Sequence, residues 1–359
     1  MSYKYTGFIP QNIAPSGAKQ IGVYDSNGDK VCSIALGRLS PVTKEKLYSF
    51  GLVSDIHLWH LSANWDPNTK FDNALTYFEN GGCVMCIVCG DLTQTGFYRR
   101  TDESDASTTY LDEAQLAKYK EICDKHTIPV YELSGNHECY YNQPVTKNLD
   151  KWETYTGKGV LSYTITQGDD LFILLGQPTA GSVMSDEDLQ WLSETLETNR
   201  NKRCFVFVHS YIEEDSGDPI DKRENSIFEP WGATKTNAFL NVMRHYKNAI
   251  LFHGHSHMKF ECQELDDNAN YTDKNGFNSI HIPSLGRPRN IDLSSSTTPY
   301  ADAESQGYIV DVYEDCIVLN GIDFINDEYI PIGVYKIDTS LQAVGAGTFT
   351  DSTGTITTT

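Results

Sequence analysis

Side chains that can bind a metal ion or transfer a proton stand directly after several apolar, β-prone segments of this chain. Aspartate supplies a carboxylate, asparagine an amide oxygen and histidine an imidazole nitrogen. This mixture of hard and borderline donors suits zinc, manganese or iron better than an ion that prefers thiolates. Seven residues are therefore candidate metal ligands: Asp55, His57, Asp91, Asn136, His209, His255 and His257.

The run Gly135-Asn136-His137-Glu138 holds the most varied chemistry of these sites. A strand that ends in glycine turns sharply and lifts the next side chains away from the sheet. Asn136 offers a neutral oxygen, His137 can carry or give a proton, and Glu138 can hold an imidazole in one tautomer. Taken alone, the run is equally compatible with an ordinary polar turn.

Each candidate ligand also has a plain structural explanation when it is considered singly. An aspartate after glycine is common turn chemistry, and a lone buried histidine is more often hydrogen-bonded than metal-bound. His255 and His257 are more specific, because alternate positions of an extended segment project to one face and can chelate an ion. The repeated placement of such residues after apolar segments favours a shared site.

Five apolar segments must position these side chains, and residues at helical spacing separate them. Phe71, Leu75 and Phe78 are an example of that spacing. Alternating strands and helices predict a mostly parallel sheet, whose loops at the carboxyl ends of strands gather along one edge. The expected strands lie in 47–54, 82–90, 130–134, 204–208 and 249–252, and the expected helices near 71–78, 116–123, 186–199 and 236–247.

The remainder of the chain is mainly β-prone. Two alternating runs, 20–24 and 31–35, flank an Asn-Gly turn and predict an appended hairpin. Turn signals about 168–170 predict a second hairpin. Further strands are expected at 279–285, 308–313, 316–319 and 329–337, and the expected units are a hairpin appendage at 1–46, a main domain at 47–340 and a threonine-rich tail at 341–359.

The composition limits the classes of function. The formal charge is −21, from 49 acidic and 28 basic residues, so the chain repels phosphate backbones at long range and nucleic-acid binding is disfavoured. No apolar run reaches the length of a membrane span, and the first residues lack the apolar core of a signal peptide. We expect a soluble protein made in the cytoplasm.

Nine cysteines, an odd number in a long chain, favour reduced thiols. Cys83, Cys86 and Cys89 have a spacing that could suggest an iron–sulfur cluster or zinc. They lie in a segment expected to be a strand, where a spacing of three sends successive side chains to opposite faces. We therefore expect these thiols to pack in the core and not to share a metal.

The order of the motifs resembles the calcineurin-like metallophosphoesterase superfamily over about residues 47–337. The motifs are Asp55-Ile-His57, Gly90-Asp91, Gly135-Asn-His-Glu138, His209 and Gly254-His-Ser-His257. The residues that flank the first two motifs are similar to those of the bacterial cyclic-nucleotide phosphodiesterase-like branch. Gln94 stands where the purple acid phosphatase branch has tyrosine, which argues against a charge-transfer iron site.

The resemblance implies an α/β fold, a four-layer sandwich of two mixed β-sheets flanked by helices. It also implies two divalent metal ions (Mn, Fe or Zn), one held by Asp55, His57 and His257, the other by Asn136, His209 and His255, with Asp91 bridging. The expected chemistry is in-line attack of a metal-bridging hydroxide on a phosphate ester.

Other roles follow from position in the sequence. His137 would be the general acid, with Glu138 orienting its imidazole, and Arg287 and Arg289 would contact an anionic part of the substrate. Solvated surface arginines are the simpler explanation of the last pair. Substrates range from a small phosphate ester to a phosphodiester-containing polymer.

Phosphodiester hydrolysis is the preferred reading, and the alternatives are a phosphomonoesterase or a structural component. In the structural reading, the chain would be a binding or scaffold protein associated with a phage particle or a cell surface. The oligomeric state is left open by the sequence.

Overall fold

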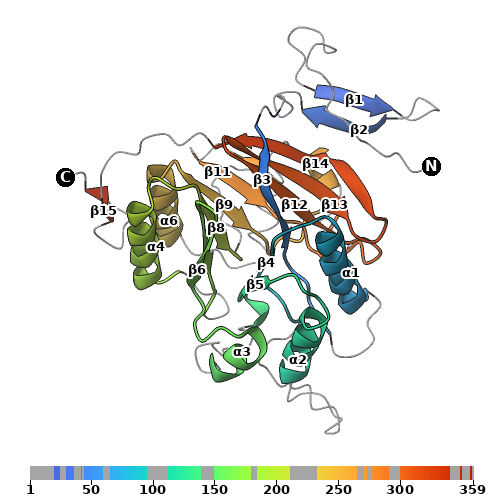
Figure 1. Ribbon diagram of the computed structural model, residues 1–359, viewed down its shortest axis with the longest axis horizontal. Helices are drawn as coiled ribbons and strands as arrows, with labels where there is room; N and C mark the ends of the chain where they lie inside the picture. Colours follow the sequence, from blue (N-terminus) through green and yellow to red (C-terminus); the bar gives the residue numbers. More distant parts are fainter. Residues whose placement is uncertain are drawn as a thin grey trace.

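The protein is built from four layers, two β-sheets that face each other and helices on both outer faces (Figure 1). The structure is a computed structural model. Its layers confirm the expected αββα sandwich. The model describes residues 20–24, 30–35, 42, 44–59, 65–94, 112–138, 149–178, 184–210, 233–264, 271–272, 277–290, 300–339, 348–349 and 356–357.

The first sheet, which we call the β3 sheet, joins the start of the main domain to its end. Its order is β14 (Glu328–Asp338), β13 (Cys316–Asp323), β12 (Gln306–Tyr313), β3 (Lys46–Val53), β4 (Cys86–Cys89) and β5 (Val130–Leu133). Strands β3, β4 and β5 are parallel to one another. Strand β12 pairs antiparallel with β3 on one side and with β13 on the other, and β13 pairs antiparallel with β14. The outer helices of this half are α1 (Pro67–Asn80), α2 (Asp112–Cys123) and α3 (Leu149–Thr156).

Helix α1 shows why the helices form where they do. The side chain of Asp66 caps the first turn by accepting a hydrogen bond from the Thr69 amide, and Pro67 begins the helix. Its apolar residues recur three and four positions apart, so they form one buried face against the β3 sheet. These buried residues are Phe71, Ala74, Leu75 and Phe78.

The second sheet, the β8 sheet, has the order β10 (Tyr271–Thr272), β11 (Asn278–His281), β9 (Ala249–His253), β8 (Cys204–Val208), β7 (Asp170–Leu175) and β6 (Tyr163–Gln167). Strands β7, β8, β9 and β11 run parallel, so their carboxyl ends point the same way. Helices α4 (Asp186–Thr198) and α6 (Ala233–His245) pack on the outer face, and Ser185 and Asp188 form a capping box on α4.

Aromatic side chains fill the space between the two sheets. Phe50 of β3 meets Phe172 of β7 edge to face, with ring centroids 5.1 Å apart, and Phe207 stacks on Phe252 at 5.0 Å. All four rings are fully buried. This packing fixes the two sheets against each other and so fixes the spacing of the loops at their ends.

A buried ion pair links the amino ends of strands in both sheets. The Arg203 side chain donates to both carboxylate oxygens of Asp170, at 3.0 and 2.6 Å, and to the carbonyl oxygen of Tyr313 at 2.7 Å. The Tyr48 hydroxyl donates to the same carboxylate. Every polar atom of the pair faces a partner, as a buried charge requires.

The predicted strands and helices are present, and their bounds differ from the expected ones by at most four residues. The hairpin of β1 (Gln20–Tyr24) and β2 (Lys30–Ala35) is confirmed, although its turn lies outside the described residues. The Cys86 thiol packs between the β3 sheet and its helices, whereas the Cys89 thiol packs between the two sheets, so these two thiols do not converge. Within the described tail, β15 (Thr348–Phe349) pairs with β16 (Ile356–Thr357), which was not predicted.

The structure also contains α3, β10 and the 3-10 helix η5 (Phe260–Glu264), which the sequence analysis did not predict. The proposed domain boundaries stay predictions. No helix in the described ranges is long and apolar enough to cross a membrane.

Candidate metal centre

All seven candidate ligands lie together at the carboxyl ends of strands from both sheets. They form two groups of buried side chains that share Asp91, and within each group the ligand atoms lie within 4.8 Å of one another. The Asn136 amide oxygen joins the second group, 3.1 Å from Nε2 of His209. The first group is Asp55, His57, Asp91 and His257; the second is Asp91, His209 and His255.

The backbone of this region is held in an uncommon conformation. Seven non-glycine residues in the described ranges have positive φ, and five of them are candidate ligands: Asp55, His57, Asp91, His255 and His257. Such conformations cost roughly 1–3 kcal/mol each and persist where the surrounding structure enforces them. Strain therefore concentrates at the strand ends that carry the ligand candidates.

Two glycines make room for this arrangement. A Cβ atom on Gly135 would lie 2.2 Å from Oδ1 of Asp91, and one on Gly90 would lie 2.4 Å from Nδ1 of His209. Gly90 also has φ of +86°, which disfavours any L side chain. The glycines of both motifs are thus explained by close packing around Asp91 and His209.

Backbone carbonyls fix the orientation of the imidazoles. Nδ1 of His209 donates to the Cys89 carbonyl at 2.8 Å, and Nδ1 of His257 donates to the Arg287 carbonyl at 3.1 Å. Each of these rings therefore directs Nε2 towards the centre of the site. His255 faces the second group through Nδ1, which lies 3.3 Å from Nε2 of His209.

Several buried polar atoms of the site face one another as the ligands of a shared cation would. Oδ1 of Asp55 lies 3.1 Å from Nε2 of His257, and Oδ2 of Asp91 lies 3.1 Å from Nε2 of His209. Nε2 of His57 lies only 2.9 Å from Nε2 of His257. Lone pairs of neutral imidazoles at that distance repel unless a proton or a cation lies between them, so the donor set fits two divalent ions.

The charges of the site also favour cation binding. Burial raises the pKa of Asp91, but the neighbouring histidines outweigh it and hold the pKa well below its usual range. Burial lowers the pKa of His209, but the carboxylates of Asp91 and Asp55 outweigh it and raise the pKa to about 10. The carboxylates and imidazoles of the site thus stabilise each other's charged forms, and binding of a metal ion would require neutral imidazoles.

His137 points its ring edge towards the same centre. Its Nε2 lies 3.8 Å from Oδ2 of Asp91, and its Nδ1 donates to the Gln94 carbonyl at 2.5 Å. The backbone amide of His137 donates to Oδ1 of Asp91 at 2.8 Å. The ring is therefore fixed beside the metal ligands with Nε2 facing inward.

Glu138 does not have the orienting role that the sequence suggested. Its carboxylate accepts hydrogen bonds from the amide of Gly135, at 2.8 Å, and from the amide and hydroxyl of Thr93, both at 2.9 Å. Glu138 thus fixes the turn after β5 to the turn after β4, and the Gln94 carbonyl orients His137. The prediction was wrong because adjacent side chains in this tight turn point in different directions.

Arg287 and Arg289 lie beside His257, in a wall that they form with Trp65 and Tyr300. The Arg287 guanidinium carbon lies 4.4 Å from the ring centroid of Trp65 and 3.9 Å from that of Tyr300, while Arg289 lies 4.6 Å from Tyr300. The Tyr300 ring is 6.0 Å from the His257 ring. Both arginines are therefore held by aromatic rings next to the first ligand group.

The fold and site together define a dinuclear metallohydrolase, and comparisons with known proteins give the family. The family model for calcineurin-like phosphoesterase matches residues 48–259. The chain belongs to this family and is a phosphoesterase of the dinuclear, metal-dependent type. A search of curated proteins finds no significant match.

Solved structures show the same fold at low sequence identity. A dimetal phosphatase from the zebrafish Danio rerio has a TM-score of 0.57 and 17% identity, covering 82% of this chain and all of that one. The purple acid phosphatase PPD1 from yellow lupin (Lupinus luteus) has a TM-score of 0.52 and 13% identity. That match covers 89% of this chain, which spans 59% of the lupin enzyme.

Sequence reasoning missed the groups that support the ligands. The carbonyl oxygens of Cys89, Gln94 and Arg287 act through the backbone, so no residue type could identify them. Trp65 and Tyr300 form the aromatic wall, but the sequence gives no signal that they meet across the fold.

Proposed function

We propose that the protein hydrolyses phosphate diesters at a centre of two divalent metal ions. The observation that carries this proposal is the position of Asp91, whose Oδ2 is 3.1 Å from Nε2 of His209 and 3.8 Å from Nε2 of His57. A carboxylate between two sets of imidazoles is suited to bridge two cations. Two bound ions would supply an activated water and neutralise charge on the phosphoryl oxygens.

The residues of the chain would divide the work of binding and proton transfer. Asp55, His57 and His257 would hold one ion, and Asn136, His209 and His255 the other. His137 would protonate the departing alkoxide through Nε2, because Nδ1 is committed to the Gln94 carbonyl. Burial lowers the pKa of His137, and the negative charge of a bound phosphate would raise it again.

The local charge supports a diester over a monoester. A diester carries one negative charge, whereas a monoester carries close to two near neutral pH. Arg287 is the less buried of the two arginines, but its Nε donates to the Asp302 carboxylate at 3.1 Å, which offsets its charge. Arg287, with Arg289 behind Tyr300, would contact a further anionic part of the substrate and not the scissile phosphate.

Metal analysis combined with a substrate screen tests the proposal. Protein loaded with Mn, Fe or Zn should contain two ions per chain and should hydrolyse bis(nitrophenyl) phosphate with a higher kcat/KM than nitrophenyl phosphate. Preference for the monoester would establish a phosphomonoesterase instead. Two bound ions with no activity on any ester would favour a scaffold role.

A second measurement tests His137. Replacing His137 with alanine should lower turnover roughly 100- to 10,000-fold on an alkyl diester, whose leaving group needs a proton. The loss should be much smaller on the nitrophenyl diester, because nitrophenolate leaves without protonation. Equal losses on both substrates would exclude the acid role.

A further inference from the structure

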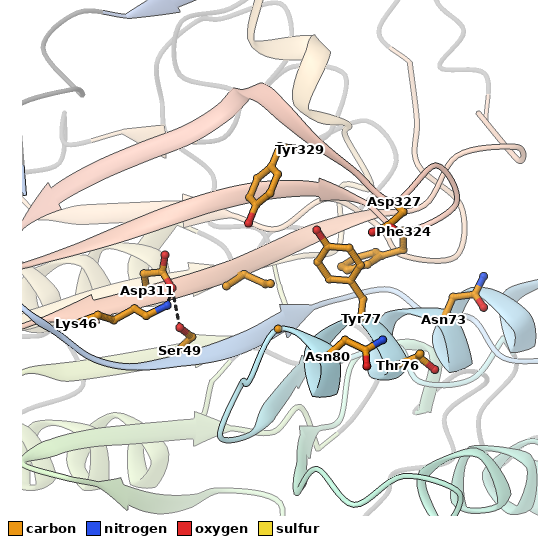
Figure 2. A pocket seen from close by; sticks show the side chains of 12 residues that line it. Lys46, Ser49, Asn73, Thr76, Tyr77, Asn80, Asp311, Phe324, Asp327 and Tyr329 are labelled. Atoms are coloured by element: carbon orange, nitrogen blue, oxygen red, sulfur yellow. Dashed lines mark hydrogen bonds and ion pairs between the residues drawn. The ribbon is translucent and has the colours of Figure 1, made fainter. Parts of the chain in front are cut away.

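A groove lies on the outer face of the β3 sheet, and none of the candidate metal ligands lines it. It encloses about 490 Å³, a size within the range of small-molecule sites. Figure 2 shows helix α1 along one side and the turn between β13 and β14 on the other. Residues Ile309 and Asp311 of β12 are part of its lining.

One face of helix α1 is composed for this groove. Asn73, Thr76, Tyr77 and Asn80 recur at spacings of three, one and three, so they share a face of the helix, and all four line the groove. That face carries amides, a hydroxyl and a phenol where exposed helix faces usually carry charged side chains. The amides of Asn73 and Asn80 make no hydrogen bond within the described ranges, so they can bind a ligand.

Two tyrosines stand on opposite sides of the groove. Figure 2 shows the Tyr77 side chain rising from α1 and the Tyr329 side chain descending from β14 on the opposite side. The ring of Tyr77 packs edge to face on Phe324, with centroids 5.7 Å apart, which holds it in place. Tyr329 is 49% exposed. The groove thus offers one fixed and one accessible aromatic ring, each with a hydroxyl at its tip.

The charges at the groove are nearly balanced. The Asp311 carboxylate accepts hydrogen bonds from Ser49 at 2.6 Å and from the Lys46 ammonium at 3.1 Å. The charges of Lys46 and Asp311 therefore offset each other, and Asp327 is the remaining charged residue in the lining. A groove with this balance lacks the positive charge that a phosphate or a nucleic acid requires.

We propose that this groove binds a neutral oligosaccharide. The apolar faces of sugar rings would pack on Tyr77 and Tyr329, and sugar hydroxyls would hydrogen-bond to the amides of Asn73 and Asn80. The site is separate from the metal centre, so it would hold a glycan without taking part in ester hydrolysis.

Isothermal titration calorimetry on the full chain tests this assignment. The probes are tetrasaccharides of glucose, galactose, mannose and N-acetylglucosamine, each titrated up to millimolar concentration. At least one should bind, and both Tyr329→Ala and Asn80→Ala should weaken its binding at least tenfold. Ile325→Ala is the matched control, because Ile325 is 43% exposed on the same turn but does not line the groove.

Activity on a nitrophenyl diester and the unfolding temperature should be unchanged in all three variants, which would show that any loss of binding is local. Absence of binding by all four probes would overturn the proposal. So would binding that survives Tyr329→Ala, or equal weakening by Ile325→Ala. Self-association of the wild-type chain that Tyr329→Ala abolishes would also overturn it, because a second copy would then occupy the groove.

Discussion

The two ends of the β-sandwich treat buried charge in opposite ways. At the amino ends of the strands, Arg203 and Asp170 satisfy each other, and the Tyr48 hydroxyl completes the carboxylate. At the carboxyl ends, the inward oxygens of Asp55 and Asp91 face imidazole nitrogens 3.1 Å away. The first end is an ion pair with all its hydrogen bonds made, whereas the second is a group of ligand atoms that suits a cation.

The backbone differs in the same direction. The candidate ligands Asp55, His57 and Asp91 have φ between 50° and 54°, while none of Tyr48, Asp170 and Arg203 has positive φ. Backbone strain and the candidate metal ligands therefore occur together at one end of the molecule. The amino ends of the strands therefore contribute stability, whereas the carboxyl ends hold a strained site at a cost in stability.

The largest expected effect comes from Asp91→Asn. This change removes the charge shared by the two ligand groups, so kcat/KM should fall at least about 1,000-fold, equivalent to about 4 kcal/mol of transition-state stabilisation. Metal content per chain, measured by mass spectrometry, should fall below two. Full activity with two bound ions would show that Asp91 is not the bridge.

The opposite end should respond in stability and not in activity. Arg203→Ala leaves the Asp170 carboxylate buried without its partner, and the free energy of unfolding should fall by roughly 3–5 kcal/mol in a denaturant titration. The double change Arg203→Met with Asp170→Leu should recover much of that loss. The kcat of the folded fraction should stay within about twofold of wild type, and a large drop would mean that the two ends are coupled.

Metal removal should lower the stability of the protein through the ligand groups at the carboxyl ends of the strands. A ligand that binds only the folded chain adds about 2.7 kcal/mol when its concentration is 100 times its dissociation constant. Chelation should therefore lower the free energy of unfolding by about that amount per ion lost. The Asp91→Asn variant should lose less than wild type on chelation, and an identical loss in both would contradict the assignment.

Glu132 offers a smaller test, since it is a buried carboxyl group that belongs to neither the candidate metal centre nor the Arg203 ion pair. It accepts a hydrogen bond from the Tyr119 hydroxyl at 2.8 Å, and burial raises its pKa to about 7. The folded state therefore binds this proton more tightly than the unfolded state. Its stabilising effect is complete below the ordinary pKa of about 4.5 and is lost as the pH rises through 7.

Unfolding measured between pH 5 and pH 8 checks this behaviour. Wild type should lose about 2.5 kcal/mol of stability relative to Glu132→Gln over that range, because glutamine keeps an acceptor for Tyr119 but cannot ionise. Parallel pH profiles would show that Glu132 ionises normally in the folded chain.

The sequence predicted the metal centre better than its surroundings. Asp55, Asp91 and His209 each follow a continuous apolar strand, and parallel strands bring such positions together regardless of their separation in the chain. The Arg203 and Asp170 pair had no such signal, because pairing of those side chains depends on register between strands. The stacking of Arg287 on Tyr300 depends on loop conformation, which local residue types do not specify.

Both ligand groups draw residues from both sheets, and this has a consequence for the order of assembly. His57 and His257 are 200 positions apart, so an ion between them would act as a non-covalent cross-link that closes a very long loop. Neither sheet alone presents a complete set of donors, so ions can be captured only after the two sheets have docked. Metal uptake would thus be a late step in the maturation of this protein, and once bound the ions would resist separation of its two halves.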